Sequence, residues 1–246
     1  VRDVAQDLTE PNRTNNLESI RRGPVLVDIL PDGRQRPARR ELNNGDDAVG
    51  MITDDTYIGT PDREPHMRTG LFSLQNEEEI SIVACPGRTT PQIQNALINH
   101  CELMRYRFAV LDAHMPNQDS LNDVQAQRQQ YDTKYASLYH PWLLIVDPFP
   151  TKLPASLQYS IPPSGHVMGV YARTDNEKGV HKAPANEVVR GILGLRRLLN
   201  KGEHDILNPY PVNINVIRDF RSNNRGIRIY GGRVITSDPD WKYVNV

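Results

Sequence analysis

The stretch that decides the fold lies between residues 139 and 175, where the chain reads YHPWLLIVDPFP from Tyr139 and IPPSGHVMGVYARTD from Ile161. The apolar run from Tyr139 to Asp147 has the length of a strand and ends at Asp-Pro, where proline cannot continue a hydrogen-bonded ladder. We expect a buried central strand there. Pro162 to Gly165 predicts a tight turn, and the uncharged run that follows predicts a second buried, strand-like segment.

Strands and helices alternate on the N-terminal side of this stretch. The pattern predicts strands at 80–84, 107–112 and 142–146, a helix that begins at Thr90-Pro91, and a helix capped by Asp119 or Ser120. Each helix stands between two buried strands. Such strand–helix–strand units pair their strands in parallel.

The C-terminal side continues the same fold. We expect a short helix capped by Asn200 and Glu203 that ends at Asn208-Pro209, a strand at 212–217, and a hairpin of 227–230 with 233–236 about Gly231-Gly232. The prediction is an α/β fold: a three-layer domain with a mixed or parallel sheet over residues 71–246. Residues 1–70 are predicted to be a β-rich or irregular subregion, with strands at Val25–Leu30 and within Val49–Thr60.

Composition excludes several classes of protein. The formal net charge of −1 gives no support for nucleic-acid binding, which needs a basic face. No stretch approaches the roughly 18 apolar residues of a membrane-spanning helix. The two cysteines, Cys85 and Cys101, stand on a predicted strand and a predicted helix, and we interpret both as buried, space-filling thiols.

Ser164 and His166 suggest a hydrolase if an acid such as Asp112 or Asp147 orients the imidazole. However, two residues apart on a strand they would point to the same face, and no GxSxG elbow surrounds the serine. A turn serine and a partly buried histidine are the simpler interpretation. An α/β hydrolase that uses Ser164 and His166 is kept as the alternative function.

Two other ligand sites are weaker. Gly87 to Thr90 stands at a predicted helix N-terminus, where anions are favoured, but it lacks the GxxxxGK[ST] and GxGxxG patterns. Thr90 as an ordinary helix cap explains it equally well. The six histidines other than His166 are scattered without metal-ligand spacing, at positions 66, 100, 114, 140, 181 and 204. We therefore predict no metal and no cofactor.

A series of motifs begins in the second half of the quoted stretch. They are PPSGH at 162–166, ARTD at 172–175, GVHKAPANE at 179–187, LNP at 207–209 and SDPDWKYVNV at 237–246. In this order they resemble the contractile tail sheath proteins of bacteriophages, R-type pyocins and related injection particles. Several motifs in one order are more specific than any one short pattern. The resemblance covers roughly the last 110 residues, with weaker agreement back to about Ile80.

The resemblance implies structural roles for the motif residues. The signature positions are Pro162, Pro163, Gly165, Gly169 and Asp175 at the turn, followed by Pro184, Asn186, Asn208 and Pro209. The residues implied to form the exit toward a C-terminal arm are Asp238, Trp241, Tyr243 and Asn245. The core domain of the family is subtilisin-like in fold, which agrees with the α/β prediction.

The resemblance also implies a function. Sheath subunits stack as hexameric rings around a tail tube, and contraction after a baseplate signal drives the tube through the target cell envelope. The implied partners are other sheath subunits, the tail tube protein, the baseplate and the tail terminator, and in a phage the outcome is genome ejection. The implied location is the virion tail, assembled in the cytoplasm of the bacterial host. Nothing is catalysed.

Finally, the resemblance implies that the chain is a fragment, because sheath proteins continue past the WKYVNV motif into a C-terminal domain. Arms of that domain complete sheets in neighbouring subunits by strand addition. The chain by itself is therefore expected to be monomeric. Glu77, Glu78 and Glu79 form an acidic run, which is usually a solvated strand entrance, although in a sheath it could face a basic patch on a neighbour.

Overall fold

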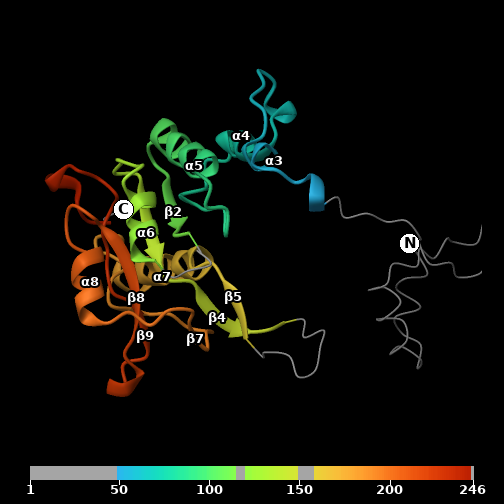
Figure 1. The fold of residues 1–246 in the computed structure, drawn as a ribbon. Helices are drawn as coiled ribbons and strands as arrows, with labels where there is room; N and C mark the ends of the chain where they lie inside the picture. The colour runs from blue at the N-terminus through green and yellow to red at the C-terminus, as the bar shows by residue number, and fades with distance from the viewer. Residues whose placement is uncertain (1–48, 115–119, 149–157, 245–246) are drawn as a thin grey trace, which may run out of the picture. The chain divides into compact units, whose positions relative to one another are not determined.

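The computed structural model describes residues 49–114, 120–148 and 158–244. The chain divides into two compact units, Val1–Met51 and Ile52–Val246. The described part of the first unit contains the short 3-10 helix η1 (Val49–Met51), and the strand predicted at Val25–Leu30 lies outside the described residues. The second unit contains the α/β fold (Figure 1).

A six-stranded mixed sheet forms the centre of the second unit. Its order is β1-β2-β3-β8-β9-β6. The bounds are β1 Ile82–Val83, β2 Phe108–Asp112, β3 Ala136–His140, β8 Ile214–Asp219, β9 Ile227–Ile229 and β6 Glu187–Val188. The first four strands pair in parallel, whereas β9 pairs antiparallel with both β8 and β6. The parallel half confirms the first predicted strand–helix–strand unit, and the second unit is present but ends in a different strand from the one predicted.

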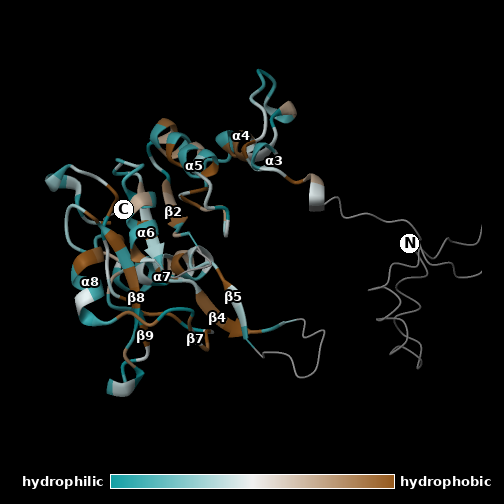
Figure 2. Cartoon of the chain, in the orientation of Figure 1, coloured by the Kyte–Doolittle hydropathy of each residue, from teal (hydrophilic) through white to brown (hydrophobic). Residues whose placement is uncertain are grey.

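Helices cover both faces of the sheet, which gives three layers. Helices α5 (Pro91–Met104), α6 (Leu121–Arg128) and α8 (Lys201–Leu207) pack on one face, and α7 (Ser164–Lys178) packs on the other. In β2, Ala109 and Leu111 face the first core while Phe108 and Val110 face the second, because successive strand residues point to opposite faces. Figure 2 shows hydrophobic residues along part of β8, whose sequence INVIRD ends in two charged residues. The predicted α/β class is correct, and the subtilisin-like label stays a prediction.

Local signals set the starts of two helices. Thr90 is the N-cap residue of α5 and Pro91 its first residue. Asn200 and Glu203 form a reciprocal capping box at α8, in which the side chain of each accepts a hydrogen bond of 2.9 Å from the backbone N–H of the other. Both predicted starts are confirmed, because such interactions span a few residues and need no distant partner.

The apolar run from Tyr139 to Asp147 is not one strand. Tyr139 belongs to β3, whereas β4 (Leu143–Val146) lies in a separate three-stranded sheet with β5 (Gln158–Ile161) and β7 (Gly194–Leu195). The break falls at the cis bond before Pro141, where the missing N–H cannot extend a ladder. The second crossover therefore ends in β3 rather than in the strand predicted at 142–146.

The segment after Pro162-Pro163 is a helix rather than a strand-like run. Helix α7 buries Val167, Val170, Tyr171 and Thr174. These residues recur at intervals of three and four, which is the helical period. The β-branched and aromatic residues favoured a strand in the sequence, but burial of one helical stripe against the sheet outweighs that preference.

The hairpin predicted about Gly231-Gly232 is also wrong. The antiparallel hairpin is formed by β8 and β9, and the 3-10 helix η4 (Arg221–Asn223) lies in its loop. After β9 the chain crosses toward β3, where the N–H of Ile235 donates to the carbonyl of Ala136 (3.0 Å) and the N–H of Thr133 donates to the carbonyl of Ile235 (2.9 Å).

Short helices, rather than strands, occupy residues 54–76. They are α3 (Asp54–Ile58), η2 (Pro65–Met67), α4 (Gly70–Ser73) and η3 (Leu74–Asn76). The strands predicted within Val49–Thr60 are therefore wrong. The predicted domain division near residue 70 stays a prediction, because most of residues 1–70 lies outside the described part of the chain.

Buried His140 should make stability depend on pH. Burial, with the nearby charge of Arg197 as a smaller cause, lowers the pKa of His140 to about 4. The unfolded histidine binds a proton below about pH 6.5, so the unfolded state holds more protons between about pH 6.5 and 4. We therefore expect the free energy of unfolding to fall by up to about 3 kcal/mol across that window as pH decreases.

Urea unfolding of the wild type and of His140→Phe from pH 4 to 7 measures this effect. The variant removes the titrating group at similar volume, so its stability should fall less with acid than that of the wild type. Parallel pH profiles for the two proteins would contradict the assignment to His140.

Candidate functional site

The serine suggested as a nucleophile is bonded to a carboxylate. Ser164 is the first residue of α7, and its Oγ donates to Oδ2 of Asp112 at 2.8 Å while its backbone N–H donates to Oδ1 at 2.8 Å. No imidazole stands between them. His166 lies on a different side of the helix, with its Nε2 beside Gly191, because residues two apart on a helix diverge. The catalytic triad of the alternative hydrolase is not assembled, and the argument that both residues share a strand face was wrong.

Asp112 instead joins three elements. It ends β2 with 2% of its surface exposed, and besides Ser164 it accepts a hydrogen bond from the N–H of Gly87, after β1, at 3.0 Å. Burial raises its pKa, and these three hydrogen bonds act in the opposite direction. A carboxylate bonded in this way fixes the start of α7 against the ends of two parallel strands.

The same carboxylate argues against an anion at Gly87 to Thr90. The N–H of Gly87 already faces Asp112, and the hydroxyl of Thr90 donates to the carboxylate of Asp54. Arg88 lies 3.8 Å from Asp54. A phosphate would meet two carboxylates in this region and find donors already used, so the Gly87–Thr90 segment is a structural turn and helix start.

A buried amide network on the other side of Asp112 was missed in the sequence. The side-chain amides of Gln94, from α5, and Gln127, from α6, both donate to the carbonyl of Asp112, at 2.8 and 3.0 Å. Gln127 also donates to Gln94 (2.9 Å) and accepts from the N–H of His114 (2.7 Å). No local pattern announces these contacts, since the partners are 13 to 33 residues apart.

The later motifs converge on one cavity, which we call the signature pocket. Its volume is about 360 Å³, and its lining residues are Ala183, Ala185, Asn186, His204, Asn208, Tyr230, Gly231, Gly232, Arg233 and Tyr243. Three of the predicted signature or exit residues therefore meet here, from segments as far apart as residues 186 and 243. This is the candidate functional site of the described chain.

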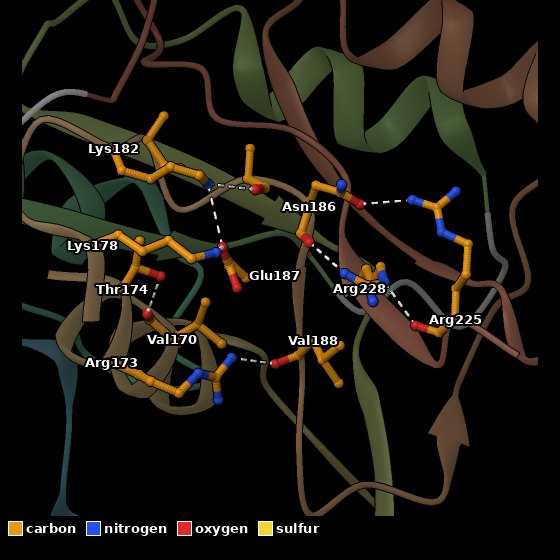
Figure 3. Close-up of polar contacts among 12 residues, drawn as sticks. Val170, Arg173, Thr174, Lys178, Lys182, Asn186, Glu187, Val188, Arg225 and Arg228 are labelled. Carbon is orange, nitrogen blue, oxygen red and sulfur yellow. Dashed lines mark hydrogen bonds and ion pairs between the residues drawn. The ribbon is translucent and has the colours of Figure 1, made fainter. Parts of the chain in front are cut away.

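Asn186 lines the signature pocket, and Figure 3 shows the polar contacts that hold it and the strand β6 that follows it. Asn186 adopts a left-handed backbone conformation with φ of 60°. Its carbonyl accepts from Arg228 (2.6 Å) and its side-chain oxygen accepts from Arg225 (3.0 Å). Next to it, Glu187 pairs with Lys178 at 2.5 Å and Lys182 at 3.3 Å. The hydrogen bond from Lys178 is the largest cause that lowers the pKa of Glu187.

Gly231 also lines the pocket, and it lies very close to two asparagine side chains. A Cβ at this position would stand 2.3 Å from Nδ2 of Asn208 and 2.8 Å from Oδ1 of Asn215. Asn208 uses that nitrogen to donate to the carbonyl of Ile214 (3.1 Å). Asn215 bonds both the N–H and the carbonyl of Arg233, each at 2.7 Å. Gly231 is therefore required for the two asparagine side chains to reach their backbone partners.

The remaining signature positions lie elsewhere. Pro162, Pro163, Gly165 and Gly169 stand at the N-terminal half of α7, where Pro163 is the buried N-cap residue. Gly165 and Gly169 are exposed, and a Cβ on either would meet no atom within 4 Å. The fold of the described chain does not itself require glycine at these two positions. The last positions are placed individually: Asp175 is half-buried on α7, Pro184 is buried, and Pro209 is exposed after α8.

The exit segment is anchored on the surface of the core. Ser237 donates to Asp132 through both its N–H (2.8 Å) and its hydroxyl. Asp238 caps the 3-10 helix η5 (Pro239–Trp241), and the ammonium of Lys134 lies 3.7 Å from the centre of the Trp241 ring. Tyr243 forms a bridge with Arg233, whose guanidinium stacks over its ring. Asn245 lies outside the described residues.

The candidate metal ligands of the described residues do not form a cluster. Among the residues that the structure describes, no group of three His, Cys, Asp or Glu side chains is placed to hold a metal ion. Cys101 is fully buried and its pKa is raised to about 12 by burial, while Cys85 is half-buried. Within the described ranges no helix is long and apolar enough to cross a membrane.

Comparison with known proteins identifies relatives. Residues 64–234 match the family described as phage tail sheath protein central domain. The tail sheath protein of Escherichia phage P2 is 27% identical over 220 residues, which are 84% of this chain and 52% of that protein. The chain thus spans about half the length of the curated relatives that it matches.

The chain is also similar to chains in solved structures of contractile injection particles. A chain of the sheath complex of an extracellular contractile injection system, PVC, in its contracted state is 27% identical with a TM-score of 0.57, over 72% of this chain and 47% of that one. A chain of the baseplate of the anti-feeding prophage is 30% identical with a TM-score of 0.52, over 68% of this chain and 41% of that one.

Two glycines in opposite surroundings give a matched test of these assignments. Gly231→Ala should destabilise the chain by roughly 1–3 kcal/mol, because the new methyl group overlaps two asparagine side chains. Thermal or urea unfolding measures the loss. An unfolding midpoint equal to that of the wild type would contradict the close approach at the signature pocket.

Gly169→Ala should have the opposite sign. The position is exposed and helical, and a Cβ there meets nothing, so alanine should stabilise the chain by about 1 kcal/mol through its higher helix propensity. The same unfolding measurement applies, and destabilisation by Gly169→Ala would show that the fold needs glycine at this site after all.

Proposed function

Because this chain belongs to the phage tail sheath family, we propose that it is the central domain of a contractile sheath subunit that packs with other copies around a tail tube. The match over residues 64–234 carries this proposal. The relatives are structural sheath proteins rather than enzymes, so the chain is a structural protein and the proposal includes no reaction. The absence of a triad around Ser164 agrees with this conclusion, since its hydroxyl is bonded to Asp112.

We further propose that the subunits form hexameric rings that stack into a helical sheath, and that a baseplate signal lets the sheath contract and drive the tube through the target envelope. The related particles support this reading, since one baseplate is described with sixfold symmetry and two sheaths in a contracted state. The proposed partners are further sheath subunits, the tube protein, the baseplate and the tail terminator. The proposed location is the tail of a particle assembled in the bacterial cytoplasm, with genome ejection if the particle is a phage.

The architecture suits a subunit that moves as a rigid body. Asp112 ties α7 to the ends of β1 and β2, and the signature pocket brings together the segment before β6, helix α8, the segment after β9 and the exit segment. A body held by buried hydrogen bonds keeps its shape while contacts on its surface are exchanged. Contraction would then release the free-energy difference between two arrangements of nearly rigid subunits, without chemistry.

The exit residues fit the start of an arm. Trp241 and Tyr243 are anchored by Lys134 and Arg233, so a segment that continues from this point leaves from a fixed position. In our proposal such a segment adds a strand to a neighbouring subunit, where main-chain hydrogen bonds give connectivity with little demand on sequence.

Electron microscopy of the whole gene product, expressed by itself and compared with residues 1–246, tests the function. At physiological salt we expect tubes or rings with sixfold symmetry from the gene product and none from the 246-residue chain. A gene product that stays compact and unassembled at high concentration, in both low and high salt, would contradict the sheath assignment.

A further inference from the structure

The two outer strands of the main sheet lie in regions of opposite charge. Strands β1 and β6 stand at the two edges, each paired with one described strand only. Residues 52–81, which lead into β1, contain seven Asp or Glu and two Arg, a formal charge of −5. Residues 187–229, from β6 to β9, contain eight Lys or Arg and four Asp or Glu, a formal charge of +4. Six strands at about 4.8 Å spacing put roughly 24 Å between the edges.

The backbone that carries the carboxylates beside β1 is held in place, and the carboxylates themselves form no ion pair in the described structure. Glu77, Glu78 and Glu79 are exposed, and none forms an ion pair with another described residue. Buried Arg107 fixes their loop, because its guanidinium donates to the carbonyl of Glu77 and to that of Ile80 (3.1 Å). Because the backbone is fixed, only the glutamate side chains have to be ordered when a partner binds.

The basic edge is positioned in a similar way. Arg225 is exposed at the end of the β8–β9 loop, with one guanidinium nitrogen bonded to Asn186 (Figure 3). Arg190 is exposed two residues after the end of β6. Neither arginine forms an ion pair within the part of the chain that the structure describes.

Each edge also presents apolar surface. A hollow of about 450 Å³ lies among α3, α4, α5 and the end of β1, lined mainly by apolar side chains such as those of Leu71, Leu74 and Leu97. On the basic side the side chain of Leu193 is 39% exposed, and its carbonyl accepts a hydrogen bond from Arg221 in the β8–β9 loop (2.9 Å). One chain therefore supplies an acidic edge with an apolar hollow and a basic edge with an exposed leucine.

We propose that the acidic edge of one copy, formed by Glu77–Glu79 and the apolar hollow, binds the basic edge of a second copy, formed by Arg190, Arg225 and Leu193. Because the two patches are different and lie on opposite sides, the contact is heterologous, and each added copy leaves one edge of each kind free. Such contacts generate rings or helices. This inference rests on the proposed function and names one surface through which the subunits meet.

Sedimentation velocity of the 246-residue chain tests the contact. At about 10 mM salt the Debye length is about 30 Å, and at about 1 M it is about 3 Å. We expect the average mass of concentrated chain to rise well above the 27.9 kDa of one copy at low salt and to return to it at high salt. A mass that does not change with salt overturns the proposal.

Charge-reversal variants then test whether these two edges form the contact between copies. Glu78→Lys with Glu79→Lys, and separately Arg190→Glu with Arg225→Glu, should each abolish the low-salt association. All four changes in one chain exchange the signs of the two edges and leave the net charge unchanged, so association should return. Asp123→Lys with Asp240→Lys is the control: both residues are exposed away from the two edges, the net charge equals that of the Glu78 and Glu79 variant, and association should persist.

Loss of association in the control, or no recovery in the four-residue exchange, would overturn the edge contact. If Arg190→Glu with Arg225→Glu lowers the unfolding midpoint, Arg190→Gln with Arg225→Gln repeats the test by removing the two positive charges without adding negative ones. The two proposals remain separable. Tubes from the gene product that are indifferent to every charge variant keep the sheath function and remove this contact, whereas absence of tubes under all conditions removes the function itself.

Discussion

The carboxylate of Asp112 is the constraint on which the arrangement of the core depends. It stands at the end of β2 and binds the N-terminus of α7 on one side and the N–H of Gly87 on the other. The carbonyl of the same residue receives the amides of Gln94 and Gln127, from the helices on the opposite face of the sheet. One residue therefore joins all three layers. A buried carboxylate is costly without partners, so the geometry of α5, α6 and α7 has to satisfy it together.

Features of the fold that depend on interactions within a few residues could be predicted from the sequence, and features that depend on distant contacts could not. The starts of α5 and α8 were predicted because Thr90-Pro91 and Asn200 with Glu203 act within a few residues. The alternation of strands and helices gave the α/β class and the parallel half of the sheet. Tyr139 to Asp147 was misassigned because its hydrophobic pattern does not reveal that Pro141 separates two sheets. Helix α7 was misassigned because β-branched residues obscured a helical stripe, which only the facing sheet makes favourable.

In the candidate site too, the local motifs could be predicted and the long-range contacts between them could not. The motifs around Asn186, Asn208 and Tyr243 were recognised one by one, yet their convergence on one pocket depends on contacts between segments far apart in the chain. The hydrogen bonds of Asp112 to Gly87 and Ser164 span 25 and 52 residues, so no local pattern could show them. Gly231 and Gly169 look alike in the sequence, but one is packed against two asparagines and the other meets nothing. Sequence names the residue type, and only packing shows whether the fold needs it.

The two hydrogen bonds between Ser237 and Asp132 affect how the chain would respond to a pulling force. Ser237 is bonded twice to Asp132, and two residues before it Ile235 is bonded to Ala136 and Thr133 beside β3. A pulling force on the end of the described chain would therefore be transmitted to β3 through the hydrogen bonds of Ser237 and Ile235. These neighbouring bonds would bear the force together. Bonds that must break together resist more force than bonds that open one after another. The segment can thus act as a tether that transmits a pull to the whole body instead of unravelling from it.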